Sequence, residues 1–224
     1  YAEAGYRYAV SVDLSKYFDT LNHELLMNLL HRKIQDMRVL RIIKKYLKSG
    51  VMENGVVSKT EEGSPQGGPL SPLLANIYLN EFDWEMHSRG VKTVRYADDI
   101  VVFAKSKRAA ERLLESSRRY LEGKLKLKMN TEKSKVTSIF AVRDFKFLGF
   151  CIGKNGSGIY IRAHRKSLNR AKEKLKLLTK RNCGHNVRRV MAEVKVFIRG
   201  WLGYFHVAEM KRMMKSWDEW LRRR

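Results

Sequence analysis

The chain has 224 residues, of which 44% are hydrophobic, enough for one large domain or for a medium and a small one with a real core. Its 46 Lys and Arg against 23 Asp and Glu give a net charge of +23, which favours a polyanionic partner, such as nucleic acid or an acidic membrane surface, over a solvated basic face. Cys151 and Cys183 lack the spacing of a zinc site or disulfide framework, and no membrane span or secretion signal is present, so we expect a cytoplasmic protein.

The first part of the chain predicts strands and amphipathic helices joined by short loops. A β-rich stretch ends at Asp13, and Asn22 is a candidate N-cap for a helix with four leucines on one face. After the loop "EEGSPQGGPLSP", Ser71 and Pro72 fit the N-cap and first residue of a longer helix. The expected elements are a strand at 8–14, helices at 22–34 and 37–48, a hairpin at 50–60, and a helix from 71 past 82.

The next part is again mixed. The expected elements are a hairpin around 95–104, a helix at 109–121, and strands at 136–140, 145–152 and 159–162, the last two joined by the turn-like "KNGSG". Because strands and helices do not alternate strictly, we expect an α+β fold with a small antiparallel sheet backed by helices.

The tail differs in composition from the rest. Residues 162–224 hold 19 Lys and Arg against 5 Asp and Glu, and leucines and an alanine recur at helical spacing from Leu168 to Leu178. We therefore expect two domains, 1–162 and 163–224, the second a basic helical one.

Two adjacent aspartates, Asp98 and Asp99, interrupt the β-rich stretch "RYADDIVVFA". A divalent cation between the two carboxylates would offset their repulsion, and Mg²⁺ prefers carboxylate oxygens as ligands. Without further context, the simpler interpretation of such a pair is a solvated turn, and that of Asp13 is a cap at the end of a strand. If a sheet pairs the strand ending at Asp13 with this hairpin, three carboxylates meet as two-metal phosphoryl transfer requires.

Five ordered stretches carry a family resemblance: "VDLSKYFDTLNH", "GSPQGGPLSPLLANIYLNEFD", "RYADDIVVFAKS", "LKMNTEKSKV" and "FKFLGF". They resemble the palm motifs of reverse transcriptases, specifically those of the group II intron-encoded bacterial lineage, and "IRGWLGYF" with "WDEWLRRR" resembles the thumb, or maturase X region. Palm-class viral RNA polymerases are the nearest competitor, but they usually carry GDD and a second Asp where this chain has Phe18.

The resemblance implies roles at matching positions. Asp13, Asp98 and Asp99, with the Leu14 carbonyl, would hold two Mg²⁺ ions. Phe18 would exclude a ribose 2′-hydroxyl, although a core Phe is the alternative. The further residues implied are Gln66 and Gly67 in the nucleotide pocket, Lys133 near the pyrophosphate unless it is simply solvated, and Phe147, Leu148 and Gly149 as the primer grip.

The basic tail is expected to dominate RNA affinity, through Arg165, Lys166, Arg170 and Lys172. The implied function is an RNA-directed DNA polymerase of the bacterial cytoplasm that transfers dNTPs to a DNA or RNA primer on an RNA template, intron RNA in this lineage. The alternatives are an RNA-binding maturase that assists splicing without polymerising, and a defence or CRISPR-associated reverse transcriptase. A homodimer stays open. Since the family's fingers should precede Tyr1 and its thumb continue past Arg224, we expect the isolated chain to be poorly active.

Overall fold

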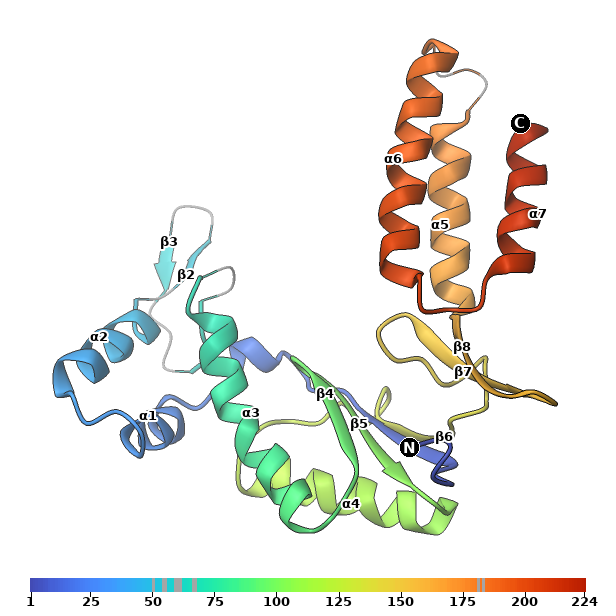
Figure 1. The fold of residues 1–224 in the computed structure, drawn as a ribbon. Coiled ribbons are helices and arrows are strands. Elements are labelled where there is room, and N and C mark those ends of the chain that lie inside the picture. Colours follow the sequence, from blue (N-terminus) through green and yellow to red (C-terminus); the bar gives the residue numbers. More distant parts are fainter. Residues whose placement is uncertain (50, 54–55, 59–61, 66–67, 181, 183) are drawn as a thin grey trace. The chain divides into compact units, whose positions relative to one another are not determined.

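The computed structural model describes residues 1–224 except 50, 54–55, 59–61, 66–67, 181 and 183. The chain forms two compact units, of which the first holds Glu3–Thr137 and the second Ser138–Arg224. Figure 1 draws the first unit in blue to green and the second in yellow to red. The division between the units, after Thr137, comes earlier in the chain than the expected domain boundary near residue 162. The expected domain boundary therefore stays a prediction.

The first unit is built on a four-stranded sheet in the order β4-β5-β1-β6. The strands are β1 Tyr8–Val12, β4 Thr93–Tyr96, β5 Asp99–Ala104 and β6 Lys135–Ser138. Strand β1 pairs antiparallel with β5, with Val12 opposite Ile100, and β5 pairs antiparallel with β4. Both β1 and β5 are central, which explains why their residues are mostly buried apolar ones. The expected α+β fold with a small, largely antiparallel sheet is confirmed.

Helices cover this sheet and extend the core beside it (Figure 1). They are the 3₁₀ turn Tyr17–Asp19, α1 His23–His31, α2 Met37–Leu47, α3 Ser71–Ser88 and α4 Lys107–Gly123, and a short hairpin of β2 Val51–Glu53 and β3 Val56–Ser58 lies between α2 and α3. Helix α4 packs against β1 and β5, and α3 packs against β4 and α1. Tyr78 of α3 is fully buried, its hydroxyl donates to the Leu125 carbonyl at 2.7 Å, and burial raises its pKa to about 12.

Two expected helix starts can be compared with the structure. Asn22 caps α1 as predicted, since its side chain accepts a hydrogen bond from the Leu25 N–H. The prediction for α3 was wrong by one residue, because Leu70 is the N-cap and Ser71 is already helical. The Ser71 hydroxyl donates instead to the Pro65 carbonyl at 2.6 Å, and this hydrogen bond ties the preceding loop to the helix.

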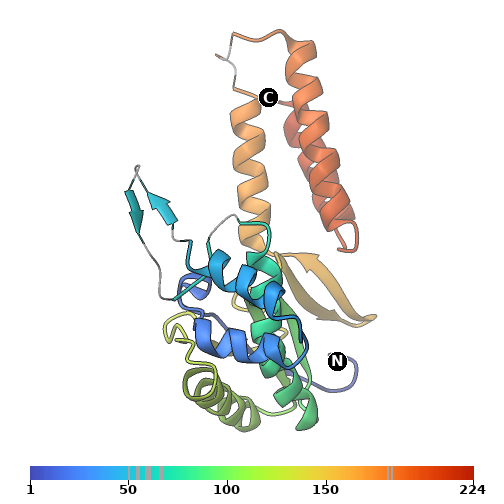
Figure 2. The ribbon, with the colours of Figure 1, turned by 90° about the vertical axis from the view of Figure 1, so that its left-hand side faces the viewer.

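The second unit joins a hairpin to three helices, drawn in yellow to red in Figure 2. Its elements are β7 Phe150–Asn155, β8 Gly158–Ala163, α5 Arg165–Leu178, α6 Val187–Phe205 and α7 Lys211–Arg222. The expected seam on α5 is confirmed, because Ala171 and Leu175 are buried together with Trp217 of α7. The Trp201 and Trp217 rings lie 5.3 Å apart and join α6 to α7.

The strand expected at 145–152 begins only at Phe150. Leu148 and Gly149 have positive φ angles of 48° and 84°, which no strand tolerates, and they form a turn instead. Among the described residues, no helix combines the length and apolar composition that a membrane crossing requires.

Asn22→Ala should lower the free energy of unfolding by about 1 kcal/mol, because the first turn of α1 loses its side-chain acceptor. Asn22→Asp, which keeps an acceptor oxygen, is the matched control and should stay within about half of that loss. Urea unfolding followed by circular dichroism measures both. Equal stability of the alanine variant and the native protein would contradict the capping role.

Candidate active site

The end of the β1–β5 pair carries the acidic residues. Val12 lies opposite Ile100, so the antiparallel register continued by one residue sets Asp13 opposite Asp99. Side chains directly opposite on such a pair lie about 5 Å apart at Cβ and point to the same face. Val12 and Ile100 point into the core, so Asp13 and Asp99 lie on the other face.

Asp98 lies in the turn between β4 and β5. Tyr96 pairs with Asp99, so Ala97 and Asp98 form a two-residue loop. Ala97 has a φ of 53° while Asp98 does not have a positive φ, which is the pattern of a type II′ turn. That turn normally places Gly at its first position, so the Ala97 backbone is strained. The loop is exposed and presents Asp98 to solvent at the sheet end.

A segment just before β6 holds Asp13. Its N–H donates to Ser134 Oγ at 3.0 Å, and its carbonyl accepts the Asn130 N–H at 2.8 Å. Lys133 Nζ lies 3.6 Å from Asp13 Oδ2. With 69% of the Lys133 side chain exposed, this ion pair contributes little stability, but it shows that a cation is accommodated at the Asp13 carboxylate.

Leu14 is buried and faces Met129 across an isolated antiparallel bridge. No backbone N–H of the described residues donates to its carbonyl. This oxygen is therefore available beside the Asp13 carboxylate.

Phe18 is half-buried against the main core, with its ring centroid 5.5 Å from that of Tyr17. Burial raises the pKa of the Tyr17 hydroxyl above its usual range, so this group stays protonated and donates to the Ala75 carbonyl of α3. The Phe18 carbonyl accepts the Ser64 N–H at 2.7 Å. Phe18 is thus fixed between α3 and the loop that precedes it.

The loop before α3 approaches the backbone of Asp19 so closely that only glycine fits at position 63. Gly63 has a φ of +88°, and a Cβ there would lie 2.8 Å from the Asp19 carbonyl oxygen. Its carbonyl is 2.6 Å from His23 Nε2. Gln66 and Gly67, expected in the nucleotide pocket, lie outside the described residues.

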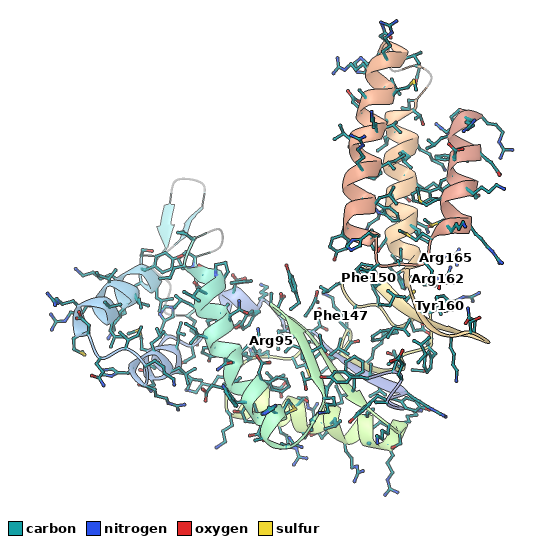
Figure 3. All side chains as sticks on the ribbon, viewed as in Figure 1. Arg95, Phe147, Phe150, Tyr160, Arg162 and Arg165 are labelled. Atoms are coloured by element: carbon teal, nitrogen blue, oxygen red, sulfur yellow. The ribbon has the colours of Figure 1, made fainter. Side chains whose placement is uncertain are left out.

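The three residues expected at the primer's end form a tight turn in the second unit. Phe147 and Phe150 exchange two backbone hydrogen bonds, of 3.0 and 2.9 Å, around Leu148 and Gly149 (Figure 3). Two successive positive φ angles are typical of a type I′ turn. Neither the Leu148 nor the Gly149 N–H donates to any described residue.

Helices α5 and α6 hold this turn by its carbonyls. The Tyr204 hydroxyl donates to the Leu148 carbonyl at 2.9 Å, and the His164 N–H and Ser167 hydroxyl donate to the Gly149 carbonyl at 2.8 and 3.1 Å. The Tyr204 ring stacks on Phe150 at 5.6 Å. The turn's acceptors are thus bound by protein groups while two of its donors stay available.

The four basic residues expected to bind RNA are exposed on α5, but they do not form one stripe. Lys166 and Arg170 are four residues apart and share one face, whereas Arg165 and Lys172 lie on another. Lys172 also sits 5.1 Å above the Trp220 ring. The structure therefore offers two basic faces on α5.

Sequence reasoning missed the residues that hold the site, namely Ser134, Ser167 and Tyr204. Ser134 and Tyr204 lie inside quoted motifs, "LKMNTEKSKV" and "IRGWLGYF", so the motifs were the available signal. Their partners, at positions 13 and 148, are distant in the chain, and no local pattern specifies such pairs.

The chemistry of the acidic donor set suits magnesium. Carboxylate oxygens and one backbone carbonyl are the ligands that Mg²⁺ takes in proteins. Within the described part of the chain, no three His, Cys, Asp or Glu side chains are grouped as a complete metal-binding set. The structure thus brings Asp13 and Asp99 to one sheet end, with Asp98 in the adjoining turn.

Two family models match the chain. The model described as "Reverse transcriptase (RNA-dependent DNA polymerase)" matches residues 1–152, and that described as "Group II intron, maturase-specific domain" matches residues 168–224.

Curated proteins show the same likeness. Protein YkfC of Escherichia coli (strain K12) is 36% identical over 167 residues, covering 59% of this chain and 44% of YkfC. Group II intron-encoded protein LtrA of Lactococcus lactis subsp. cremoris is 29% identical over 218 residues, covering 69% of this chain and 36% of LtrA. The chain spans less than half the length of these relatives.

Among solved structures, telomerase from Candida albicans in complex with a TWJ fragment of telomeric RNA gives a TM-score of 0.55 at 13% identity, covering 93% of this chain and 40% of that one. Apo telomerase from Candida tropicalis, truncated from the C-terminal domain, gives 0.53 at 15% identity, covering 65% and 34%. At these identities the likeness shows the fold alone, and it agrees with the expected palm.

Gly149→Ala should destabilise the second unit by about 1 to 2 kcal/mol, because alanine is strained at this positive φ. The added Cβ would also lie 3.1 Å from Ser167 Oγ and 3.2 Å from Phe205 Cζ. Gly156→Ala, in the β7–β8 turn with no atom within 4 Å of the added Cβ, is the matched control. Urea unfolding compares the two variants, and equal losses would show that the 147–150 turn is not constrained.

Proposed function

The chain belongs to the reverse transcriptase family, in its group II intron-encoded maturase lineage, and on this basis we propose that it is the palm and part of the thumb of an RNA-directed DNA polymerase. The proposed reaction is attack of a primer 3′-hydroxyl on the α-phosphate of a dNTP, directed by an RNA template. Because the chain spans less than half of its curated relatives, activity is proposed for the full-length polypeptide that contains it.

One observation carries the proposal: the β1–β5 pairing ends with Val12 opposite Ile100, so Asp13 and Asp99 lie at the same sheet end, and the adjoining turn presents Asp98. Like charges close together in a sheet are destabilising, and a bound divalent cation would turn this cost into a gain. We propose that these carboxylates and the Leu14 carbonyl hold two Mg²⁺ ions. When bound, the ions would activate the primer hydroxyl and stabilise charge on the leaving pyrophosphate.

The chain's own residues would do the positioning. Phe18, held from two sides, would pack beneath the sugar and leave no room for a 2′-hydroxyl. Lys133, next to Asp13, would supply positive charge near the triphosphate. The Leu148 and Gly149 N–H groups would donate to a backbone phosphate of the primer, since backbone donors position nucleic acid by its phosphates.

RNA binding is proposed from the net charge of +23 and from the exposed basic residues of α5. A second function, intron RNA binding that assists splicing without polymerisation, is favoured by the maturase-specific match at residues 168–224. The two functions fit one chain, because the acidic residues lie in the first unit and the basic α5 in the second. Substitution of the acidic residues should remove polymerisation and leave the RNA-binding function in place, so it distinguishes the two functions.

Asp98→Asn in the full-length protein should abolish Mg²⁺-dependent primer extension, since an amide replaces a charged metal ligand, while RNA affinity is kept or improved by the loss of one negative charge. The matched control is Asp144→Asn, which removes an exposed carboxylate of the second unit. Primer extension on an RNA template and filter binding of the same RNA measure the two effects. Near-native dNTP incorporation by Asp98→Asn would overturn the two-metal assignment.

Phe18→Ala should enlarge the sugar pocket, so the preference for dNTP over rNTP should fall at least about tenfold, or roughly 1.4 kcal/mol of discrimination. Phe18→Tyr, which keeps the ring, should preserve the preference. Single-nucleotide incorporation with matched dNTP and rNTP gives the ratio. Unchanged selectivity in the alanine variant would make Phe18 a packing residue only.

A further inference from the structure

Arg95 comes directly before the acidic turn, yet its side chain points away from solvent. Along β4 the side chains alternate, so Thr93 and Arg95 face α3 while Val94 and Tyr96 are exposed on the other face. Only 13% of the Arg95 side chain is exposed. A guanidinium is seldom this buried unless its donors are all directed at acceptors.

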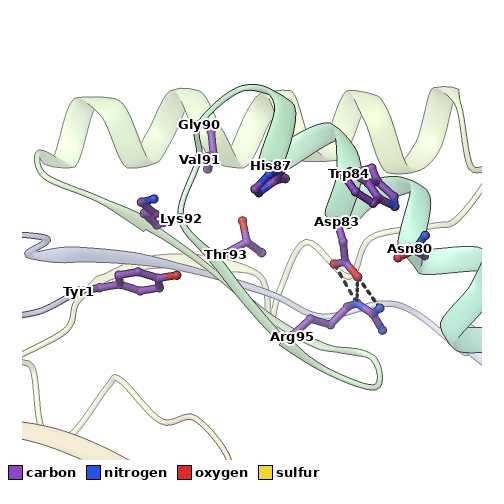
Figure 4. A pocket seen from close by; sticks show the side chains of 10 residues that line it. All are labelled: Tyr1, Asn80, Asp83, Trp84, His87, Gly90, Val91, Lys92, Thr93 and Arg95. Atoms are coloured by element: carbon purple, nitrogen blue, oxygen red, sulfur yellow. Dashed lines mark hydrogen bonds and ion pairs between the residues drawn. The ribbon is translucent and has the colours of Figure 1, made fainter.

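Helix α3 supplies most of those acceptors. Arg95 Nε donates to both Asp83 carboxylate oxygens at 2.9 Å, and Nη2 donates to Asp83 Oδ2 (Figure 4). Nη1 donates to Asn76 Oδ1 at 2.9 Å. Asn76 and Asp83 are seven residues apart on one stripe of α3, so the contacts fix Arg95 along two turns of the helix.

The remaining contact reaches the acidic turn itself. Arg95 Nη1 also donates to the Ala97 carbonyl at 3.0 Å, within the two-residue loop that contains Asp98. Ala97 is the residue with the strained positive φ, and such a conformation persists only where surrounding contacts hold it. One planar group thus ties the strained peptide to a rigid helix.

Helix α3 also holds the other side of the candidate site. Its first residue, Ser71, donates to the Pro65 carbonyl, and the Ala75 carbonyl accepts the Tyr17 hydroxyl next to Phe18. Helix α3 therefore contacts both Tyr17, the neighbour of Phe18, and, through Arg95, the turn that carries Asp98.

We propose that Arg95 is a positioning residue: through Asp83 and Asn76 it fixes the Ala97–Asp98 loop on α3 and so sets where the Asp98 carboxylate stands toward the metal ions. This inference rests on the proposed function. A fork of donors is required, because one group must satisfy a carboxylate, an amide and a carbonyl in three directions, which a lysine ammonium on its flexible stem does not do. An ion pair serving stability alone would need only Asp83.

The test is Arg95→Lys, which keeps the charge and the pairing with Asp83 but loses the fork. Its matched control is Arg89→Lys. Among the described residues, the side chain of Arg89, at the α3 C-cap, contacts Glu85 in an exposed ion pair at 3.7 Å and Ser116 in a weak hydrogen bond. Mn²⁺ binding is titrated by electron paramagnetic resonance, and amide hydrogen exchange of residues 96–99 is followed in the same proteins. Arg95→Lys should weaken Mn²⁺ binding about tenfold or more, as the loss of a group that orients a metal ligand does, and should speed amide exchange in the loop. Arg89→Lys should change neither.

Asn76→Ala is the second variant, for the case that Arg95→Lys does not fold. It removes one acceptor of the Arg95 guanidinium and leaves the Asp83 partner in place, so no buried charge loses its pair. It should also weaken Mn²⁺ binding and speed exchange in the loop, with unchanged circular dichroism. Native Mn²⁺ affinity and native exchange in the folded variant would overturn the positioning role. If Asp98→Asn itself leaves Mn²⁺ binding unchanged, the metal assignment fails instead, so the two failures are distinguishable.

Discussion

The antiparallel pairing of β1 with β5 is the constraint on which the rest of the first unit depends. A slip of one residue would turn every side chain of β1 to the opposite face, so burial of Val10 and Val12 fixes the register. The same register brings Asp13 and Asp99 to one end of the pair, just beyond Val12 and Ile100. Apolar burial therefore brings two like charges to one end of the sheet, although their mutual repulsion is unfavourable.

Much of this organisation could be predicted from local pattern. The helices at α1 and α2, the Asn22 cap and the mixed strand order all follow from short-range rules that the structure obeys. The family followed from five ordered motifs, and the two family models confirm it. The roles of the individual site residues remain predictions, since ligand geometry is a property of the loaded site.

What pattern could not predict depends on contacts between distant residues. "FKFLGF" looks like a buried strand because its residues are apolar, but the Tyr204, His164 and Ser167 donors favour a turn at its centre. The register of Ser71 in α3 is likewise set by the Pro65 carbonyl, and the burial of Arg95 by Asp83. In each case a polar group finds its partner in another element, and propensity carries no information about that partner.

We propose that the end of the β1–β5 pair holds two metal ions. The most direct measurement is a crystal structure of the full-length protein with an RNA template, a DNA primer, a non-hydrolysable dNTP and Mn²⁺, with the metal located by anomalous scattering. We expect two peaks, both within bonding distance of carboxylate oxygens from Asp13 and Asp98, with the Leu14 carbonyl bound to one of the two ions. Peaks elsewhere in the protein, or an ordered dNTP with no peak at Asp13 and Asp98, would contradict it.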